Sequence, residues 1–280
     1  MGARSRLPWV MALAIALAML PACAKPRQVL DRRAHEGGLT RLQLEGRGFA
    51  HLAYARGSPA GRLHVYLEGD GLAWLRPDLP SADPTPHRTL MFDAMLLDTG
   101  AALYLGRPCQ FIGLTRANCT PLAWTHQRYA PAIVESLATA LRAFLDRHPA
   151  RTLVFFGHSG GGTLATLLAA RFPQTRAVVT IAANLDVDAW TTTHAYSKLV
   201  GSLDPARQPA LPPTLRQWHL AGRDDAEVPP VLLQGYLAIN PGAWFSIIDG
   251  FDHSCCWLAL WPGILRIVAA LPDVPPPAAK

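Results

Sequence analysis

One strand–turn–helix stretch restricts the fold of this chain more than any other. Residues 152–156 are apolar and β-favouring, as in a strand buried on both faces, and residues 163–171 are rich in alanine and leucine and predict a helix. Between them lies the pattern Gly157-x-Ser159-x-Gly161. A serine on so sharp a turn has a strained backbone and needs small neighbours. The context predicts a nucleophilic serine at the positive end of a helix; the alternative is a glycine-rich turn with an incidental serine.

The length and composition of the chain fit one large α/β domain. It has 280 residues, of which 50% are hydrophobic and 16% are charged. The expected strands are residues 41–47, 49–55, 62–67, 101–105, 152–156, 177–182, 216–221 and 243–248, and the expected helices are residues 90–97, 128–147, 163–171, 230–239 and 257–271. Strands that alternate with helices indicate a mostly parallel central sheet with helices on both faces.

The rest of the chain divides around this domain. We expect an α/β domain at residues 41–271, which includes a short irregular cap segment at residues 183–215. Residues 23–40 are polar and predict a tether. Residues 272–280 are rich in proline and alanine and predict a disordered tail.

Residues 1–22 have the pattern of a signal peptide. Basic residues precede an apolar run at residues 9–20, which is too short to span a bilayer comfortably. The run ends in Leu-Pro-Ala-Cys23, which resembles the lipobox of bacterial lipoproteins, in which the cysteine is acylated and becomes the new N-terminus. This predicts a lipid-anchored protein of the bacterial cell envelope. Ala24, rather than an aspartate, follows the cysteine, which by resemblance to bacterial sorting favours the periplasmic face of the outer membrane. The alternative is an ordinary signal cleaved at the Ala-x-Ala-like site formed by residues 22–24.

Charge and motifs limit the other partners. The formal net charge of +6 is spread along the chain without the concentrated basic patch that suggests nucleic acid. No Gly-x-Gly-x-x-Gly follows a predicted strand and no phosphate loop is present, so we expect no cofactor. The oligomeric state stays open.

Four cysteines remain besides Cys23, and an exported protein meets an oxidising compartment. Cys109 and Cys119 lie in one loop, and their pairing is our first choice. A bond between the adjacent Cys255 and Cys256 would bring the Cα atoms closer than disulfides favour, so cross-pairing with the other two is the alternative. A metal site is not expected, because the histidine near this pair has a better role.

That histidine is His253. A serine hydroxyl is a poor nucleophile near neutral pH and needs a base, which in turn needs an acid to orient it. After an elbow of this kind the expected chain order is serine, aspartate or glutamate, then histidine. His253 directly follows the last predicted strand, where active residues gather in an open α/β sheet. We predict Ser159 as nucleophile and His253 as base, the alternative being a histidine of a surface loop.

The acid has several candidates. Asp225 stands in the segment 222–229, three residues after a glycine that ends a predicted strand, and is our first choice. Asp224 is adjacent and is expected to point elsewhere. Asp186 and Asp188 follow the preceding strand, from which some serine hydrolases take their acid.

A tetrahedral intermediate also needs backbone N–H donors for its oxyanion. One should be Gly160, directly after the nucleophile. The second should come from the loop after the strand at residues 62–67, for which we predict Asp70, with Gly71 as second choice. The alternative for that loop is a structural glycine turn.

These motifs together resemble the α/β-hydrolase superfamily, and within it an exported bacterial lipoprotein branch. The matching positions are Gly157, Ser159 and Gly161 of the elbow, Gly222, Asp225, Val228 and Pro229 of a Gly-x-x-Asp-x-x-Val-Pro signature, and Phe251 and His253 of a closing Phe-x-His. The resemblance covers residues 41–271 and implies a serine hydrolase that cleaves carboxylic esters through an acyl-enzyme. The chain has Glu-Gly-Asp-Gly at residues 68–71 where many lipases have His-Gly-Gly-Gly.

The fold itself does not determine the substrate. Lipase, thioesterase and peptidase activities remain alternatives, as does a non-enzymatic envelope protein that kept the fold as a binding scaffold. Trp190 and His194 of the cap segment and Trp257 are expected near the catalytic pocket, where large aromatics would shorten an acyl channel. We therefore predict esters of short to medium acyl chains, without activation at a lipid–water interface.

Overall fold

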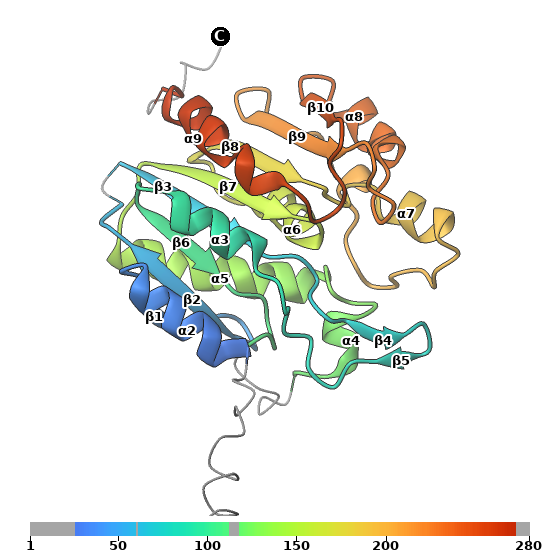
Figure 1. Cartoon of the computed structure of the whole chain (residues 1–280), viewed down its shortest axis with the longest axis horizontal. Helices are drawn as coiled ribbons and strands as arrows, with labels where there is room; N and C mark the ends of the chain where they lie inside the picture. The colour runs from blue at the N-terminus through green and yellow to red at the C-terminus, as the bar shows by residue number, and fades with distance from the viewer. Residues whose placement is uncertain (1–25, 60, 112–117, 273–280) are drawn as a thin grey trace, which may run out of the picture.

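The computed structural model describes residues 26–59, 61–111 and 118–272. Its centre is an eight-stranded sheet in the order β1-β2-β6-β3-β7-β8-β9-β10, with helices on both faces (Figure 1). β2 pairs antiparallel with both β1 and β6, whereas all neighbours from β6 across to β10 are parallel. The predicted α/β fold with a mostly parallel sheet is confirmed.

The elements have the following bounds. The strands of the large sheet are β1 Thr40–Glu45, β2 Ala50–Arg56, β3 Arg62–Leu67, β6 Ala102–Leu105, β7 Thr152–His158, β8 Thr175–Ile181, β9 Arg216–Gly222 and β10 Trp244–Ile248, and a separate hairpin consists of β4 Trp74–Arg76 and β5 Leu79–Pro80. The α-helices are α2 Pro26–Glu36, α3 Leu90–Leu97, α4 Pro121–Trp124, α5 Pro131–Arg147, α6 Gly160–Ala169, α7 Val187–Thr193, α8 Gln234–Ile239 and α9 Trp261–Ala269. Three short 3-10 helices are η1 Pro205–Arg207, η2 Pro230–Leu233 and η3 Trp257–Ala259.

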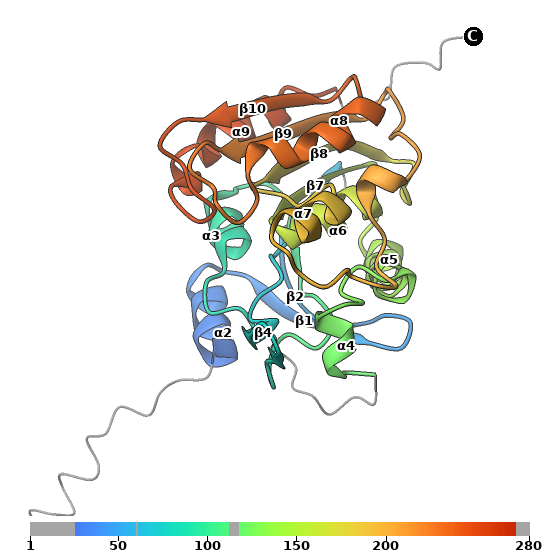
Figure 2. The ribbon, with the colours of Figure 1, turned by 90° about the vertical axis from the view of Figure 1, so that its right-hand side faces the viewer.

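The sheet separates two apolar cores. Leu153 and Phe155 of β7 pack with α5 and α6 on one face, and Val154 and Phe156 pack with α2, α3 and α9 on the other. Figure 2 shows these two helical layers on opposite sides of the strands. Because successive residues of a strand face opposite sides, a strand covered on both faces is apolar at every position. This explains why residues 152–156 show no alternation of polar and apolar side chains.

The expected tether is wrong for most of its length. Residues 26–36 form α2, which packs on the sheet with Leu30 and Ala34 buried. These two residues are four apart and so lie on one face of a helix. The Tyr54 hydroxyl donates a 2.6 Å hydrogen bond to Asp31 and ties α2 to β2.

Two other segments differ from expectation. The cap segment 183–215 is not wholly irregular, because it contains α7 and η1. The hairpin β4–β5 and the helix α4 were not predicted; in the ribbon they lie together at one end of the molecule (Figure 1). The helix predicted from residue 163 begins at Gly160, since the glycine run forms its first turn.

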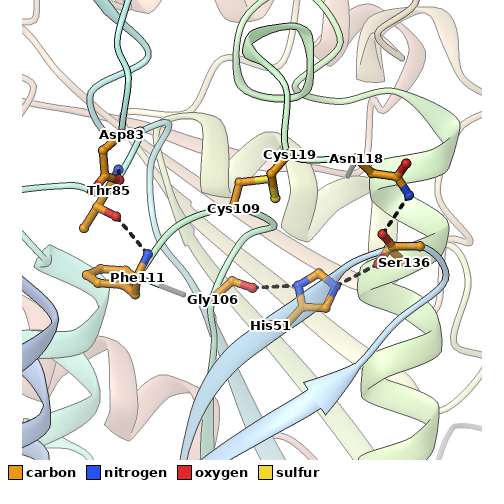
Figure 3. The surroundings of a disulfide bond; sticks show 10 residues. His51, Asp83, Thr85, Gly106, Cys109, Phe111, Asn118, Cys119 and Ser136 are labelled. Atoms are coloured by element: carbon orange, nitrogen blue, oxygen red, sulfur yellow. Dashed lines mark hydrogen bonds between the residues drawn. A yellow bond between two sulfur atoms is a disulfide. The ribbon is translucent and has the colours of Figure 1, made fainter. Parts of the chain in front are cut away.

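Disulfides join Cys109 to Cys119 and Cys255 to Cys256, with Cα–Cα distances of 5.5 and 3.2 Å. The first-choice pairing is therefore confirmed, and the second pair is vicinal rather than crossed. Figure 3 shows the first bond beside the buried His51, whose Nδ1 lies 2.9 Å from the Gly106 carbonyl oxygen. Because a carbonyl only accepts, Nδ1 donates there, and Nε2 accepts from the Ser136 hydroxyl at 2.8 Å. The disulfide and the His51 hydrogen bond thus hold the described residues that directly follow β6.

The predicted signal peptide, the acylated Cys23 and most of the predicted tail fall outside the described residues. Within the ranges that are described, no helix has the length and apolar character needed to cross a bilayer.

Candidate active site

The turn between β7 and α6 carries Ser159 in a backbone conformation that residues other than glycine rarely adopt. Its φ and ψ are 52° and −127°, so the backbone is strained, as expected of a nucleophile elbow. A Cβ atom on Gly161 would collide with the carbonyl oxygens of Leu67 and Glu68. The glycine therefore lets the loop after β3 approach the serine closely.

Three side chains from separate segments meet at this turn. His253 Nε2 lies 3.1 Å from Ser159 Oγ, and His253 Nδ1 lies 2.9 Å from Asp225 Oδ2. The buried Asp225 also accepts hydrogen bonds from the backbone N–H groups of Glu227 and Val228, at 2.9 and 2.8 Å. Since a carboxylate only accepts, Nδ1 carries the proton and Nε2 is free to accept from the serine hydroxyl. The structure thus brings together the predicted nucleophile, base and acid.

The rival acids are held elsewhere. Asp186 caps α7 by accepting from the Ala189 N–H at 2.9 Å. Asp188 forms ion pairs with Lys198 and Arg207, at 3.6 and 3.8 Å. Asp224 is exposed, although it adjoins the chosen acid in sequence. None of these three carboxylates has a contact with His253 among the described hydrogen bonds and ion pairs.

The two predicted oxyanion donors lie beside each other. Gly160 is the first residue of α6, and the first N–H groups of a helix have no partner within the helix. Asp70 follows β3 in a loop that lies against the elbow: a Cβ on Gly69 would stand 3.5 Å from Ser159 Cβ. A Cβ on Gly160 would collide with the Asp70 carboxylate. Both predicted residues are therefore close to the serine, where the N–H groups of an oxyanion hole would be needed.

The Asp70 carboxylate has partners that the sequence did not indicate. Arg107 donates to Oδ1, Arg128 donates to Oδ2 at 2.6 Å, and the Tyr129 hydroxyl lies 2.8 Å from Oδ2. Both arginine side chains are only 5% exposed. Burial alone would raise the pKa of Asp70, but the charges of Arg128 and Arg107 outweigh it and hold that pKa well below its usual range. We call Asp70, Arg107, Arg128 and Tyr129 the oxyanion-loop clasp. Its two arginines and one carboxylate together carry one net positive charge.

Glu68, the acidic neighbour of this loop, points to a different element. Its Oε2 accepts from the Met91 N–H at 3.1 Å, at the start of α3. Burial raises the pKa of Glu68 to about 8, so the carboxyl is largely protonated near neutral pH. The residue therefore adds little negative charge near the oxyanion donors.

His158, between the strand and the serine, links the elbow to the loop of the base. Its Nε2 lies 2.8 Å from the His253 carbonyl oxygen and must donate to it. Burial and the neighbouring His253 lower the pKa of His158 to about 4, so it is neutral near pH 7. His158 thus positions the backbone of His253, and the His253 ring is the one that contacts Ser159.

A pocket of about 800 Å³ opens over the serine. Trp74 and Leu75 of the hairpin line one side, and Trp190 and Tyr196 of the cap segment line the other. The prediction that Trp257 borders the pocket is wrong, because this side chain is fully buried in the core, with its ring centroid 5.0 Å from that of Phe251. His194 lies 2.9 Å from the Glu227 carbonyl oxygen and is not part of the pocket wall.

Comparison with known proteins supports this description. A family model described as the alpha/beta hydrolase fold matches residues 86–216. The matched segment and the strand order show that the chain has the α/β-hydrolase fold. A search of curated protein sequences gave no significant match.

Several solved structures resemble the chain over most of its length. A bacterial membrane phospholipase A is 16% identical, with a TM-score of 0.57, over 94% of this chain and 98% of that chain. An esterase from Pyrococcus furiosus is 11% identical, with a TM-score of 0.57, over 84% and 90%. A puromycin hydrolase is 15% identical, with a TM-score of 0.55, and the match covers 81% of this chain but only 39% of the hydrolase. At these identities the likeness concerns the fold alone.

Proposed function

We propose that the protein is a serine hydrolase that cleaves carboxylic esters through an acyl-enzyme. The observation that carries this proposal is the hydrogen-bonded chain from Ser159 through His253 to Asp225 at the elbow of an α/β-hydrolase fold. A serine with a base at 3.1 Å and an acid that orients the base has the parts needed for acyl transfer.

The geometry supports the following sequence of events. Ser159 Oγ attacks the ester carbonyl carbon while His253 Nε2 takes the hydroxyl proton, and Asp225 stabilises the imidazolium. The oxyanion accepts hydrogen bonds from the N–H groups of Gly160 and Asp70. His253 then gives its proton to the departing alkoxide, which leaves as the alcohol. Water deprotonated by the same Nε2 attacks the acyl-enzyme, and His253 returns that proton to Ser159 Oγ as the carboxylic acid leaves.

A fluorophosphonate probe tests whether the serine is activated. The wild-type protein should be labelled, and Ser159→Ala should lose both the label and ester hydrolysis, with kcat lower by roughly 10⁴–10⁶-fold. Ser254→Ala, in the same loop as the base, is a suitable control and should keep the label. If the wild-type protein were not labelled, or if Ser159→Ala kept more than about a tenth of the activity, the fold would serve instead as a binding scaffold.

We propose that the substrate carries a short to medium acyl chain. The support is that Trp190 and Tyr196, unlike Trp257, line the pocket, where large aromatic side chains would shorten an acyl channel. A series of p-nitrophenyl esters tests it. The value of kcat/KM should pass through a maximum at short or medium chains, and Trp190→Ala should move the maximum to longer chains. A value that kept rising through long acyl chains, or activation by micelles, would identify a lipase instead. Faster turnover of a matched thioester or peptide analogue in the same assay would identify a thioesterase or a peptidase.

We also propose that Cys23 carries a lipid anchor that holds the protein in the bacterial cell envelope. The support is the lipobox-like end of the apolar run in the sequence. Incorporation of labelled fatty acid should be lost in Cys23→Ser. Labelling that persisted in this variant would exclude an anchor at this residue.

A further inference from the structure

The end of the molecule that carries the hairpin presents large apolar side chains to solvent. Leu75 and Leu79 of β4–β5 and Leu122 of α4 are 54%, 41% and 51% exposed. We call these three residues the leucine tip. Scattered exposed leucines are ordinary, but these three stand on neighbouring elements, and one of them, Leu75, also lines the catalytic pocket.

The tip is firmly held on the domain. The Trp124 indole N–H of α4 donates to the Ser81 carbonyl beside β5, at 3.2 Å. The rings of Trp74 and His126 meet edge to face, with centroids 5.5 Å apart. The disulfide between Cys109 and Cys119 joins the end of the β6 loop to the residues just before α4 (Figure 3). These contacts hold the hairpin and α4 beside each other, with their leucines exposed.

The start of the described chain lies at the same end as the tip. The hairpin follows β3 and α4 follows β6, so both stand at the C-terminal edge of the parallel strands, where the serine elbow lies. β1 runs in the same direction as these strands, and α2 runs opposite to β1, which brings Pro26 to this edge. Figures 1 and 2 agree: the first turn of α2, the hairpin and α4 lie at the lower end of the domain in both views.

Only a short length of chain lies between Pro26 and Cys23. Three peptide units separate these two residues, and an extended chain advances at most about 3.6 Å per residue, or about 11 Å in all. An acyl anchor on Cys23 would therefore hold this end of the domain against the membrane.

We propose that the leucine tip is a docking surface for a phospholipid bilayer, which it enters beside the mouth of the catalytic pocket. Leu75 belongs both to the tip and to the pocket wall, so one member of the tip stands at the entrance to the pocket of Ser159. Arg88 lines the same mouth and favours anionic headgroups, whereas Arg76 is ion-paired with Asp78 at 3.7 Å. The proposal concerns where the protein sits and holds whether or not the serine hydrolyses esters.

Hydrogen exchange of the full chain tests the docking. The chain is incubated with vesicles of phosphatidylcholine containing a minority of phosphatidylglycerol, and without them. Amides of residues 74–81 and 120–125 should exchange at least about fivefold more slowly on vesicles, because the bilayer interior excludes water. Leu79→Asp with Leu122→Asp should abolish this protection, and neither residue lines the pocket.

A matched control comes from the opposite edge of the sheet. Leu97 and Ile267 are 47% and 55% exposed, and they stand where α3 and α9 end, near the start of β3. Leu97→Asp with Ile267→Asp should keep the protection of the tip. Both double variants should keep the wild-type activity on a water-soluble ester, and their circular dichroism reports folding even if no ester is hydrolysed.

Three results would overturn the proposal. The first is equal exchange of the tip with and without vesicles. The second is protection that survives in the Leu79 and Leu122 variant. The third is protection that appears without lipid as protein concentration rises, which would make a second copy of the chain the occupant.

Discussion

The oxyanion-loop clasp gives the sharpest prediction about stability. In Asp70→Asn the carboxylate between Arg107 and Arg128 becomes a neutral amide, while both guanidinium groups stay in place, each on a side chain only 5% exposed. Two like charges then face each other in a poorly solvated site. Breaking a buried ion pair by removing one partner costs about 3–5 kcal/mol, because the remaining charge is uncompensated.

The expected change is large enough to measure in two ways. The free energy of unfolding from urea titrations at neutral pH should fall by about 3–5 kcal/mol. For a domain of this size each kcal/mol lowers the melting temperature by about 2–4 °C, so the total shift is about 6–20 °C. Loosening the loop should also weaken one oxyanion donor and lower kcat by about 10²-fold.

Two further variants isolate the cause. Asp78→Asn removes an exposed carboxylate from the nearby hairpin, whose ion pair with Arg76 at 3.7 Å is open to solvent, and should change stability by less than about 0.5 kcal/mol. Arg107→Met leaves Asp70 paired with Arg128 and should cost less than Asp70→Asn. If Asp70→Asn were as stable as the wild-type protein, or if Arg107→Met were the more damaging change, the assigned charge balance would be wrong.

Other predictions concern the acid, pH and the first disulfide. Asp225→Asn should lower kcat by roughly 10⁴-fold, by analogy with the Ser-His-Asp proteases, and a larger loss in Asp186→Asn would move the acid to the earlier strand. Burial lowers the pKa of His51 to about 4 and that of His219 to about 3. Their contribution to stability is therefore complete above their unfolded pKa of about 6.5 and declines as pH falls from there toward the folded values. As pH falls from about 6 to 4.5, the unfolding free energy of the wild-type protein should decrease by about 1.4 kcal/mol per pH unit more than that of His51→Asn. Equal slopes in the two proteins would contradict a neutral buried ring. Cys109→Ala should lower the unfolding free energy by about 2–3 kcal/mol, and no loss would mean that the loop closure is not stabilising.

The parts of the site that could be predicted from the sequence are those that form short contiguous motifs or directly follow a predicted strand. The elbow needs glycines within two positions of Ser159, so its signature is contiguous. Asp225 and His253 each follow a predicted strand, and the edge of a parallel sheet gathers such loops. That Asp225 and His253 lie close together follows from the order of the strands, without knowledge of any side-chain contact.

The clasp has no comparable signal. Arg107 and Arg128 lie 37 and 58 residues from Asp70, in segments with no motif, and an arginine in a loop is ordinarily solvated. Trp257 shows a related limit: its place after the catalytic loop suggested the pocket, but a sequence does not say which way one large side chain turns.

Composition misled us at the N-terminus. Residues 26–36 are rich in charged groups, which favoured a tether, and only Leu30 and Ala34 are fully buried. Two apolar residues at helical spacing are too few to stand out in a sequence. The helix is recognisable only once the sheet surface that it covers is known.

The backbone at Ser159 has a consequence for protein engineering. A serine at φ 52° and ψ −127° holds a conformation that glycine adopts far more readily. Ser159→Gly would relieve strain that Ser159→Ala retains, and the glycine protein should unfold at a higher temperature than the active one. Directed evolution for heat resistance alone would therefore reward loss of the proposed nucleophile, so any such selection on this protein must also require ester hydrolysis.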